Sequence, residues 1–260
     1  MSIYHFVRYF NPETESVHFG LREGHAIIRL LVEPWKRVEP IGVPIPLEQV
    51  TIKSPTAPSK IVCIGLNYHA HVAASQSADK PPDYPLIFLK PPSSVISTND
   101  QIVHPRISKR VDFEAELGIV IGKTAFDVPL DKAEEYIFGY TCVNDVTARD
   151  LQKKDGQWSR AKGFDTFCPV GPSIVSGINW RDLTIEGLVN NEVKQSGNTN
   201  QMIFSVPHIV SYVSSIMTLN PGDLISTGTP EGLCTFVPGD TVEVRISRIG
   251  SLVNPMVAAD

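Results

Sequence analysis

The sequence predicts a β-rich α+β fold with few, short helices. Most of the chain after residue 60 consists of short apolar runs separated by turn signals, such as Pro-Gly-Asp at 221–223 and 238–240. Stretches with helical periodicity are few, and the regular alternation of strand and helix that indicates a parallel α/β sheet is absent. With 260 residues, of which 42% are hydrophobic, the chain can bury a sizeable core.

The first 57 residues are predicted to form a small N-terminal β cap. The runs IYHFVRYF, SVHFGLREG and HAIIRLLV have strand character, and a proline-rich stretch follows them at 40–58. The polar segment SPTAPS breaks both the strand and the helix periodicity in front of a new apolar run, KIVCIGL. We therefore place a domain boundary near residue 57, with a larger domain over residues 58–260.

The larger domain is predicted to contain many strands and two helices. The further strand-like runs are PLIFLK, ELGIVIG, YIFGYTCVN, LTIEGLVNN, DLISTG and DTVEVRI. One helix is predicted over 206–217, with Ser205 as the N-cap and one face formed by Ile209, Tyr212, Val213, Ile216 and Met217. A second, shorter helix is predicted to start near Asp145, in DVTARDLQKKD.

Composition narrows the class of partner. The net charge of −5 comes from 23 basic and 28 acidic side chains without a basic stripe, so nucleic acid and anionic membranes are poor partners and a small molecule is expected. We find no signal peptide and no run of 18 apolar residues, and we expect a cytoplasmic protein. The cysteines are far apart and are predicted to be buried, reduced thiols without catalytic roles: Cys63, Cys142, Cys168 and Cys234.

Three acids stand at alternate positions directly in front of an apolar run: Asp112, Glu114 and Glu116 in VDFEAELGIVIG. Side chains of a strand alternate between its two faces, so these carboxylates are expected to point the same way. Neighbours two residues apart on a strand are about 7 Å apart, close enough for partly buried carboxylates to raise one another's pKa. On this stretch alone, a solvated edge strand and a metal site explain the pattern equally well.

Two further stretches carry candidate site residues. YTCVNDVTARDLQ ends an apolar strand at Asp145, and WSRAKGFDTFCPVGP holds Lys162 in front of an apolar run that contains proline. Taken singly, a helix cap at Asp145 and a surface charge at Lys162 would explain these two residues more simply.

These stretches, with KIVCIGLNYHAH and STGTPEG, resemble the catalytic domain of the fumarylacetoacetate hydrolase family in their order and spacing. The resemblance is to members of the acylpyruvase and 2-hydroxyhepta-2,4-diene-1,7-dioate isomerase type in particular. The resemblance covers residues 58–250, whereas residues 1–57 match only as the small variable cap that many members carry. Its motifs are G-x-N-Y-x-x-H at 65–71, FLKP at 88–91, D-x-E-x-E-L-G at 112–118, N-D-x-T-A-R-D at 144–150, AKGFDTFCPVGP at 161–172 and T-G-T-P-x-G at 227–232.

The resemblance implies a mixed β-roll fold, a homodimer, and a divalent cation held by Glu114, Glu116 and Asp145. Asp112 stands where members vary, so it is expected to be solvated or to support the ligands from behind. An all-oxygen ligand set without His or Cys favours Mg²⁺ or Mn²⁺ over Zn²⁺, with Ca²⁺ as the structural alternative. Three carboxylates, one divalent ion and a lysine at Lys162 would together be neutral.

The resemblance also implies a reaction class. Lys162 matches the active-site lysine and Thr229 a contact to the substrate carboxylate, while Arg149 and Gln152 match polar residues near the site. Family members act on enolisable 2-oxo acids and 1,3-dicarbonyls by C–C hydrolysis, decarboxylation or enol–keto isomerisation. These reactions share an enolate of a pyruvoyl unit, whose negative charge the metal and the lysine stabilise.

Hydrolysis needs, in addition, a base that activates water. In much of the family this base is a histidine, here His71, oriented by a glutamate three residues later; in this sequence that position is Ala74, so the usual partner of the imidazole is missing. Asp79 and Asp83, in the polar segment SADKPPDY, are candidate substitutes. His69 has no counterpart in the motif and is given no role.

Three hypotheses follow. The first is a metal-dependent hydrolase that cleaves a C–C bond in an acylpyruvate. The second is a tautomerase, isomerase or decarboxylase of a 2-oxo dicarboxylate such as oxaloacetate, which needs no activated water. The third is a binding protein on the same fold, stabilised by metal and without turnover.

Overall fold

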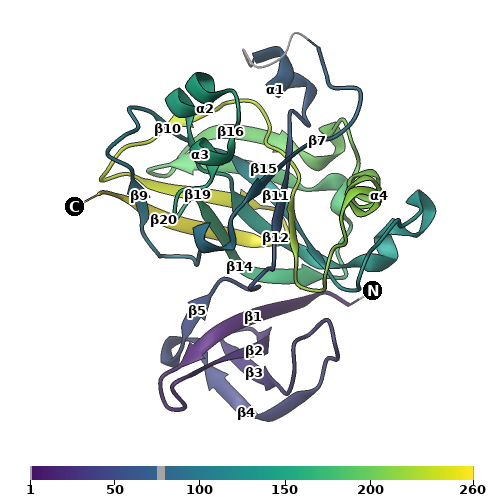
Figure 1. Cartoon of the computed structure of the whole chain (residues 1–260). Helices are drawn as coiled ribbons and strands as arrows, with labels where there is room; N and C mark the ends of the chain where they lie inside the picture. The colour runs from purple at the N-terminus through teal and green to yellow at the C-terminus, as the bar shows by residue number, and fades with distance from the viewer. Residues whose placement is uncertain (1, 75–79, 260) are drawn as a thin grey trace.

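The computed structural model describes residues 2–74 and 80–259. Figure 1 shows a small lobe built from the first strands below a larger body that contains the other strands and all the α-helices. The β-rich class with few short helices is confirmed.

The N-terminal lobe is a small antiparallel sheet. Its strands are β1 (Tyr4–Asn11), β2 (Ser16–Glu23), β3 (Ala26–Leu30), β4 (Pro40–Pro46) and β5 (Thr51–Lys53). The proline-rich stretch at 40–58 was not among the predicted strands, but Pro40–Pro46 forms β4 at the end of the sheet. Proline tolerates this place because an edge strand leaves one row of its backbone groups unpaired.

One large sheet runs through both lobes. Its central order is β4-β3-β2-β1-β14-β12-β11-β17-β6-β7, so β1 joins the small lobe to the larger body by pairing with β14. The strands of the larger body in this sheet are β6 (Ile61–Gly65), β7 (Leu86–Lys90), β8 (Val95–Ile96), β11 (Ala115–Ile121), β12 (Ile137–Asn144), β14 (Cys168–Ser176) and β17 (Leu224–Ser226). The boundary near residue 57 stays a prediction.

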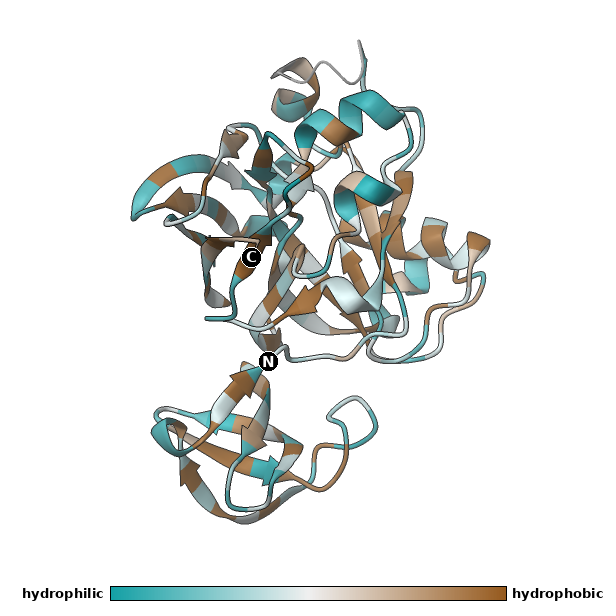
Figure 2. Ribbon diagram, turned by 60° about the vertical axis from the view of Figure 1, so that its left-hand side comes forward, coloured by the Kyte–Doolittle hydropathy of each residue, from teal (hydrophilic) through white to brown (hydrophobic). Residues whose placement is uncertain are grey.

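Two smaller sheets complete the body. A three-stranded sheet has the order β13-β10-β18, and a five-stranded sheet has the order β16-β15-β19-β20-β9. Their bounds are β9 (Ile102–His104), β10 (Val111–Phe113), β13 (Thr147–Ala148), β15 (Thr184–Val189), β16 (Glu192–Asn198), β18 (Cys234–Thr235), β19 (Thr241–Ile246) and β20 (Gly250–Ala258). The main apolar cluster fills the space between β11, the five-stranded sheet and one helix, α4, and Figure 2 shows apolar residues concentrated on the strands.

The helices are short, as predicted. The α-helices are α1 (His69–Ala74), α2 (Arg149–Asp155), α3 (Ser159–Lys162) and α4 (Val206–Ile216), and the 3-10 turns are η1 (Leu47–Gln49), η2 (Pro92–Ser94), η3 (Leu130–Tyr136), η4 (Trp180–Asp182) and η5 (Thr199–Gln201). The helix expected from Asp145 begins four residues later, at Arg149, because the intervening residues pair as β13. Helix α4 follows Ser205 but without a side-chain cap, and Ile216 on its expected apolar face is 54% exposed.

Three of the four cysteines are buried and all four are free thiols; Cys234, expected to be buried, is only half-buried. Burial raises the pKa of Cys63, Cys142 and Cys168, which keeps these thiols protonated. None of the helices in the described part of the chain is long and apolar enough to span a membrane.

The buried carboxylate of Asp223 links the residues just before β6 to the residues just before β17 by hydrogen bonds. The carboxylate of Asp223 accepts hydrogen bonds from the backbone and hydroxyl of Ser59 at 2.9 and 2.7 Å, from Lys60 Nζ at 2.6 Å and from the backbone of Asn220 at 2.8 Å. Substitution of Asp223 by asparagine should lower the free energy of unfolding by about 1–3 kcal/mol, because several part-buried donors, among them the Lys60 ammonium, then face a neutral, partly donating amide. Urea denaturation at pH 7 measures this, with the exposed Asp131→Asn as the matched control.

The effect of Asp223 should depend on pH in one direction. Burial alone would raise the pKa of Asp223, but hydrogen bonds from Lys60, Asn220 and Ser59 outweigh it and the pKa is lowered. A carboxyl whose pKa is lower in the folded protein stabilises it above the unfolded pKa of about 3.9 and loses this contribution as the pH falls further. The difference between wild type and Asp223→Asn should therefore shrink below that pH, and a constant difference would contradict the assignment.

Candidate metal centre

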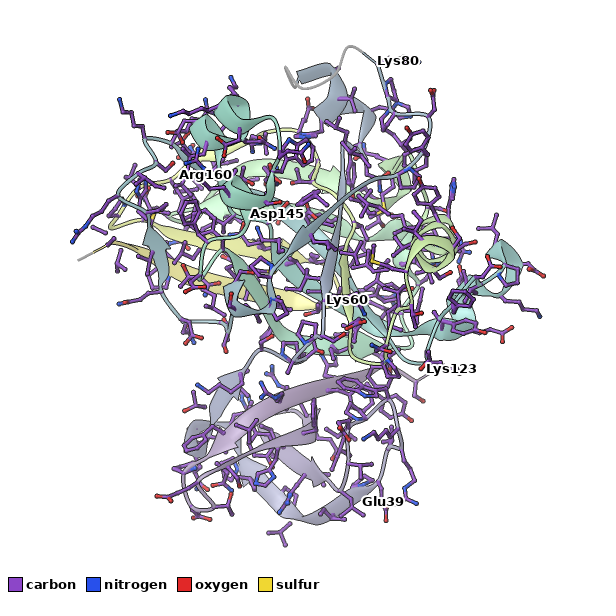
Figure 3. All side chains as sticks on the ribbon, viewed as in Figure 1. Glu39, Lys60, Lys80, Lys123, Asp145 and Arg160 are labelled. Atoms are coloured by element: carbon purple, nitrogen blue, oxygen red, sulfur yellow. The ribbon has the colours of Figure 1, made fainter. Side chains whose placement is uncertain are left out.

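The three predicted ligands meet because two neighbouring strands are antiparallel. Ala115 at the start of β11 pairs with Asn144 at the end of β12, which places Asp145 beside Glu114 and Glu116. The backbone N–H of Asp145 donates to the carbonyl of Glu114 at 2.9 Å. One carboxylate oxygen from each of the three acids lies within 4.8 Å of the others, and all three residues are buried. Figure 3 shows Asp145 deep inside the larger body.

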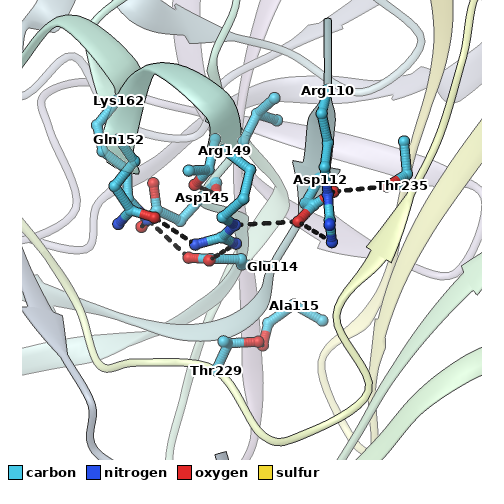
Figure 4. Close-up of polar contacts among 12 residues, drawn as sticks. Arg110, Asp112, Glu114, Ala115, Asp145, Arg149, Gln152, Lys162, Thr229 and Thr235 are labelled. Atoms are coloured by element: carbon cyan, nitrogen blue, oxygen red, sulfur yellow. Dashed lines mark hydrogen bonds and ion pairs between the residues drawn. The ribbon is translucent and has the colours of Figure 1, made fainter. Parts of the chain in front are cut away.

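Asp112 is separated from the other two alternating acids. The strand predicted over 111–122 breaks at Glu114, so β10 and β11 belong to different sheets. Asp112 is fully buried, and its carboxylate accepts hydrogen bonds from Arg110 at 2.9 and 3.0 Å, Arg149 at 3.0 Å and Thr235 at 2.8 Å. Of its two expected roles, the structure supports the one behind the ligands, because Arg149 also contacts Glu114 (Figure 4).

Two buried lysines face the carboxylates. Lys162 Nζ lies 2.7 Å from Glu114 Oε2 and 2.5 Å from Asp145 Oδ2. Lys90 Nζ lies 2.6 Å from Asp145 Oδ1 and donates to the carbonyl of Val146 at 3.0 Å. Burial alone would lower the pKa of Lys162, but Asp145 and Glu114 outweigh it and the pKa is raised. Lys162 is therefore a fixed cation at neutral pH.

The carboxylates Glu114 and Glu116 differ in their electrostatic surroundings. Burial alone would raise the pKa of Glu114, but Lys162, Arg149 and His71 outweigh it and the pKa is lowered. Burial, followed by repulsion from Asp145 and Glu114, raises the pKa of Glu116 to about 8. Lys162 acts on Glu116 in the opposite direction but does not outweigh these effects, so Glu116 is the acid that a cation would stabilise most.

The hydrogen bonds of Glu116 leave one of its oxygens available. Ser226 donates to Oε2 at 2.5 Å, and the backbone N–H of Gly228 donates to the same oxygen at 2.9 Å. Among the described residues, no hydrogen bond reaches Oε1 of this side chain. An oxygen without a donor, in a residue that lines the pocket, fits a metal ligand.

The predicted residues line a single pocket. Its wall includes His71, Glu114, Glu116, Asp145, Arg149, Gln152, Lys162 and Thr229, which are all the residues for which the family resemblance implied a catalytic, substrate-binding or metal-binding role. Apolar and aromatic residues close the rest of the wall: Ile64, Leu66, Phe88 and Trp158. The roles assigned to these side chains stay predictions, but their convergence is a fact of the fold.

His71 lies on α1 and is 8% exposed. Burial is the largest cause and lowers its pKa; Glu114 opposes this, Arg149 and Lys162 add to it, and the net effect is a lowered pKa. The imidazole is therefore neutral at pH 7 and able to accept a proton. Of the proposed substitutes for its missing partner, Asp79 lies outside the described residues, and the exposed side chain of Asp83 pairs with Lys80 at 3.7 Å.

The charges around the pocket differ from the neutral set expected from the sequence. The buried acids are Asp112, Glu114, Glu116 and Asp145, and the cations paired with them are Lys90, Arg110, Arg149 and Lys162. Four carboxylates and four cations already balance. A divalent cation would leave the site with two positive charges, and such a site favours an anionic ligand.

The donor set fits a hard divalent cation. It offers carboxylate oxygens only, buried, close together and held by a backbone hydrogen bond between Asp145 and Glu114. Oxygen ligands without sulfur or imidazole suit Mg²⁺, Mn²⁺ or Ca²⁺.

Sequence reasoning missed two residues of this site. Lys90 was present in the FLKP motif, and only its complete burial in the structure distinguishes it from a surface lysine. Gln195 on β16 is fully buried and reaches the site from another sheet. No local pattern marks a single glutamine in a strand, so its role becomes visible only in three dimensions.

The fold and this carboxylate pocket define a β-rich protein with a candidate metal centre. Residues 60–257 match the family model described as fumarylacetoacetate (FAA) hydrolase C-terminal. The chain therefore belongs to the fumarylacetoacetate hydrolase family, as its motifs predicted.

Similar proteins carry several activities in their names. The chain is 40% identical over 225 residues to the mitochondrial oxaloacetate tautomerase Fahd2a of Rattus norvegicus, covering 82% of this chain and 71% of that protein. It is 42% identical to 2-hydroxyhepta-2,4-diene-1,7-dioate isomerase from Mycobacterium marinum, with a TM-score of 0.89 and 98% of both chains covered. It is 28% identical to maleylpyruvate hydrolase from Sphingobium sp. SYK-6, solved with manganese(II) and pyruvate, with a TM-score of 0.80 over 98% of this chain and all of that one.

Proposed function

We propose that this protein is a divalent-metal-dependent tautomerase or isomerase that interconverts the enol and keto forms of a 2-oxo dicarboxylate. The observation that carries the proposal is the pocket itself, where buried cations surround a carboxylate cluster and the candidate base has no described carboxylate partner. Enol–keto conversion needs an anion site, a fixed positive charge and a group that moves a proton, but it needs no activated water. The named tautomerase and isomerase among the relatives support this choice.

The chain's own residues supply these functions. Lys162 holds a positive charge beside the pocket and stabilises negative charge that develops on the 2-oxo oxygen. His71, neutral and on the pocket wall, accepts or returns a proton during the conversion. The carboxamide oxygen of Gln152 accepts from Arg149 at 2.7 Å, so its amide nitrogen is left to donate to a ligand oxygen.

Glu114, Glu116 and Asp145 would hold the cation, which we propose is Mg²⁺ or Mn²⁺. When bound, such an ion acts as a Lewis acid and adds the positive charge that an anionic substrate requires.

Hydrolysis of a C–C bond in an acylpyruvate is the second candidate. The observation in its favour is the buried, neutral His71 on the pocket wall, which is the state that a general base requires.

A substrate panel tests the proposal. The protein, loaded with Mg²⁺, is incubated with enol oxaloacetate, keto oxaloacetate and a series of acylpyruvates, while ultraviolet absorbance follows the enol and chromatography follows cleavage products. We expect fast enol–keto conversion and slow cleavage. Fast cleavage of an acylpyruvate would make the hydrolase the correct function, and no turnover of any compound would make the protein a binding protein.

Introducing the missing glutamate should create or raise hydrolysis. Position 74 lies three residues after His71 on α1, so Ala74→Glu places a carboxylate one turn along, where it can accept the imidazole N–H and raise its basicity. General-base assistance is typically worth about 10²–10⁴-fold in rate. Acylpyruvate hydrolysis should rise by about 10²-fold or more, while enol–keto conversion, which relies chiefly on the cation and Lys162, should change much less.

The control for this gain is the double substitution Ala74→Glu with His71→Ala, which should remove it. If wild type already hydrolyses acylpyruvates fast and Ala74→Glu has no effect, another carboxylate already serves His71. The inference from Ala74 to a tautomerase would then be wrong.

We further propose a homodimer in the cytoplasm, as expected from the sequence. Analytical sedimentation at micromolar concentration measures the assembly, and a fully active monomer would contradict the dimer.

A further inference from the structure

A closed ring of hydrogen bonds joins Gln195, Thr229 and the backbone of Ala115. The N–H of Ala115 donates to Gln195 Oε1 at 2.9 Å, Gln195 Nε2 donates to Thr229 Oγ1 at 2.9 Å, and the Thr229 hydroxyl donates to the carbonyl of Ala115 at 2.9 Å. Ala115 lies between the candidate ligands Glu114 and Glu116. Figure 4 shows Thr229 beside Ala115, below the carboxylate and guanidinium groups.

The direction of every hydrogen bond in this ring is fixed by the backbone. The Ala115 N–H can only donate, so the atom of Gln195 that it meets is the carbonyl oxygen and the other is the amide nitrogen. The Ala115 carbonyl can only accept, so the hydroxyl hydrogen of Thr229 is directed at it. The second hydrogen of the Gln195 amide is also used, since Nε2 donates to the carbonyl of Pro230 at 3.0 Å.

These fixed directions determine what the hydroxyl of Thr229, which lines the pocket, can offer to a ligand. A hydroxyl has one hydrogen to donate and two lone pairs that accept. Its hydrogen is committed to Ala115 and one lone pair to Gln195, so one lone pair remains for a ligand. The side chain of threonine is also stiff about its first torsion, which resists reorientation.

We propose that Gln195 is a positioning residue that holds Thr229 as a hydrogen-bond acceptor toward the substrate, so that Thr229 recognises an O–H group and not a carboxylate. This departs from the carboxylate contact expected for Thr229 from the sequence. The donors that can serve a carboxylate lie elsewhere on the pocket wall, at Lys162 and the amide nitrogen of Gln152. A pocket with this acceptor and these donors suits a ligand that carries both an acid group and an enol hydroxyl. The inference rests on the proposed function and adds that the site recognises the enol form of the substrate through its O–H.

Two small probes separate the two roles of Thr229. Oxalate and glycolate are both small two-carbon chelators of Mg²⁺, but only glycolate carries an O–H. Calorimetry of the Mg²⁺-loaded full chain gives the dissociation constant of each probe for wild type, Thr229→Val, Gln195→Met and the double variant. Thr229→Val keeps the shape of the side chain and removes the hydroxyl, and Gln49→Met in the small lobe is the matched control for Gln195→Met.

We expect Thr229→Val to weaken glycolate binding by about 5- to 10-fold, the value of one net hydrogen bond, and to change oxalate binding by less than about twofold. Gln195→Met should weaken glycolate selectively as well, and the double variant should lose no more than Thr229→Val alone, because Gln195 acts through Thr229. A purely structural role would weaken both probes together. Thermal unfolding of each variant, measured with and without Mg²⁺, shows that the fold and its cation are retained.

Each other outcome overturns the inference. If Thr229→Val selectively loses oxalate binding, the wild-type hydroxyl donates to carboxylates. If the binding of both probes falls equally or not at all, Thr229 does not recognise an O–H group. Failure of wild type to bind Mg²⁺ would instead refute the proposed function, and the inference with it, and is recognised before any variant is compared.

Discussion

Glu116→Gln is expected to weaken Mg²⁺ binding by at least ~100-fold and to abolish turnover, because it removes one of the three negative charges that would hold the cation. Two unit charges 4 Å apart attract by about 4 kcal/mol at an effective dielectric constant of 20, and a divalent ion at a ligand lies closer than this. Glutamine keeps the length of the side chain and an oxygen that can accept from Gly228. Calorimetric titration with Mg²⁺ and Mn²⁺ measures the effect.

The matched control is Glu243→Gln on β19, which removes a largely buried carboxylate that pairs with Arg245 away from the pocket. It should leave Mg²⁺ affinity unchanged. Asp112→Asn is expected to have an intermediate effect on turnover, since Asp112 holds Arg149 but is not among the clustered carboxylates. Equal Mg²⁺ affinity of wild type and Glu116→Gln would refute the metal centre.

Lys162→Met should lower the rate of enol–keto conversion by about 10²–10³-fold, the usual effect of losing one preorganised electrostatic partner. Methionine keeps most of the length of the buried side chain and removes its charge. Affinity for Mg²⁺ should be maintained or increased, because Glu114 and Asp145 lose the ammonium that lies 2.7 and 2.5 Å from them. Initial rates at saturating Mg²⁺, with calorimetry of the ion, give both quantities.

Lys154→Met, on the exposed side of α2, is the control for the loss of a lysine near the site and should change neither quantity. Activity retained in Lys162→Met at saturating Mg²⁺ would remove Lys162 from the reaction. Loss of Mg²⁺ binding in this variant would show that the lysine organises the ligands, and would separate that role from charge stabilisation.

The sequence by itself determined the β-rich class, the family and the identity of the clustered acids. Short apolar runs bounded by turn signals placed β6, β7, β11, β12, β15, β17 and β19 within a few residues, and several of these strands are buried along almost their whole length. The alternating acids predicted one carboxylate face at Asp112, Glu114 and Glu116, but Asp112 lies on β10 in a different sheet from β11. Local signals failed at β4, which was not predicted as a strand because of its prolines, and at α2, where the short strand β13 moves the helix start from Asp145 to Arg149.

Only the tertiary structure decided which charges surround those acids and which pocket atoms donate or accept hydrogen bonds. Lys90 and Lys162 are 72 residues apart in the sequence, and both donate to Asp145 because separate elements converge on the end of β12. Gln195 and Thr229 meet Ala115 across 80 and 114 residues. Hydrogen-bond direction depends on which partner each atom finds, and partners from distant strands leave no local pattern in a single sequence.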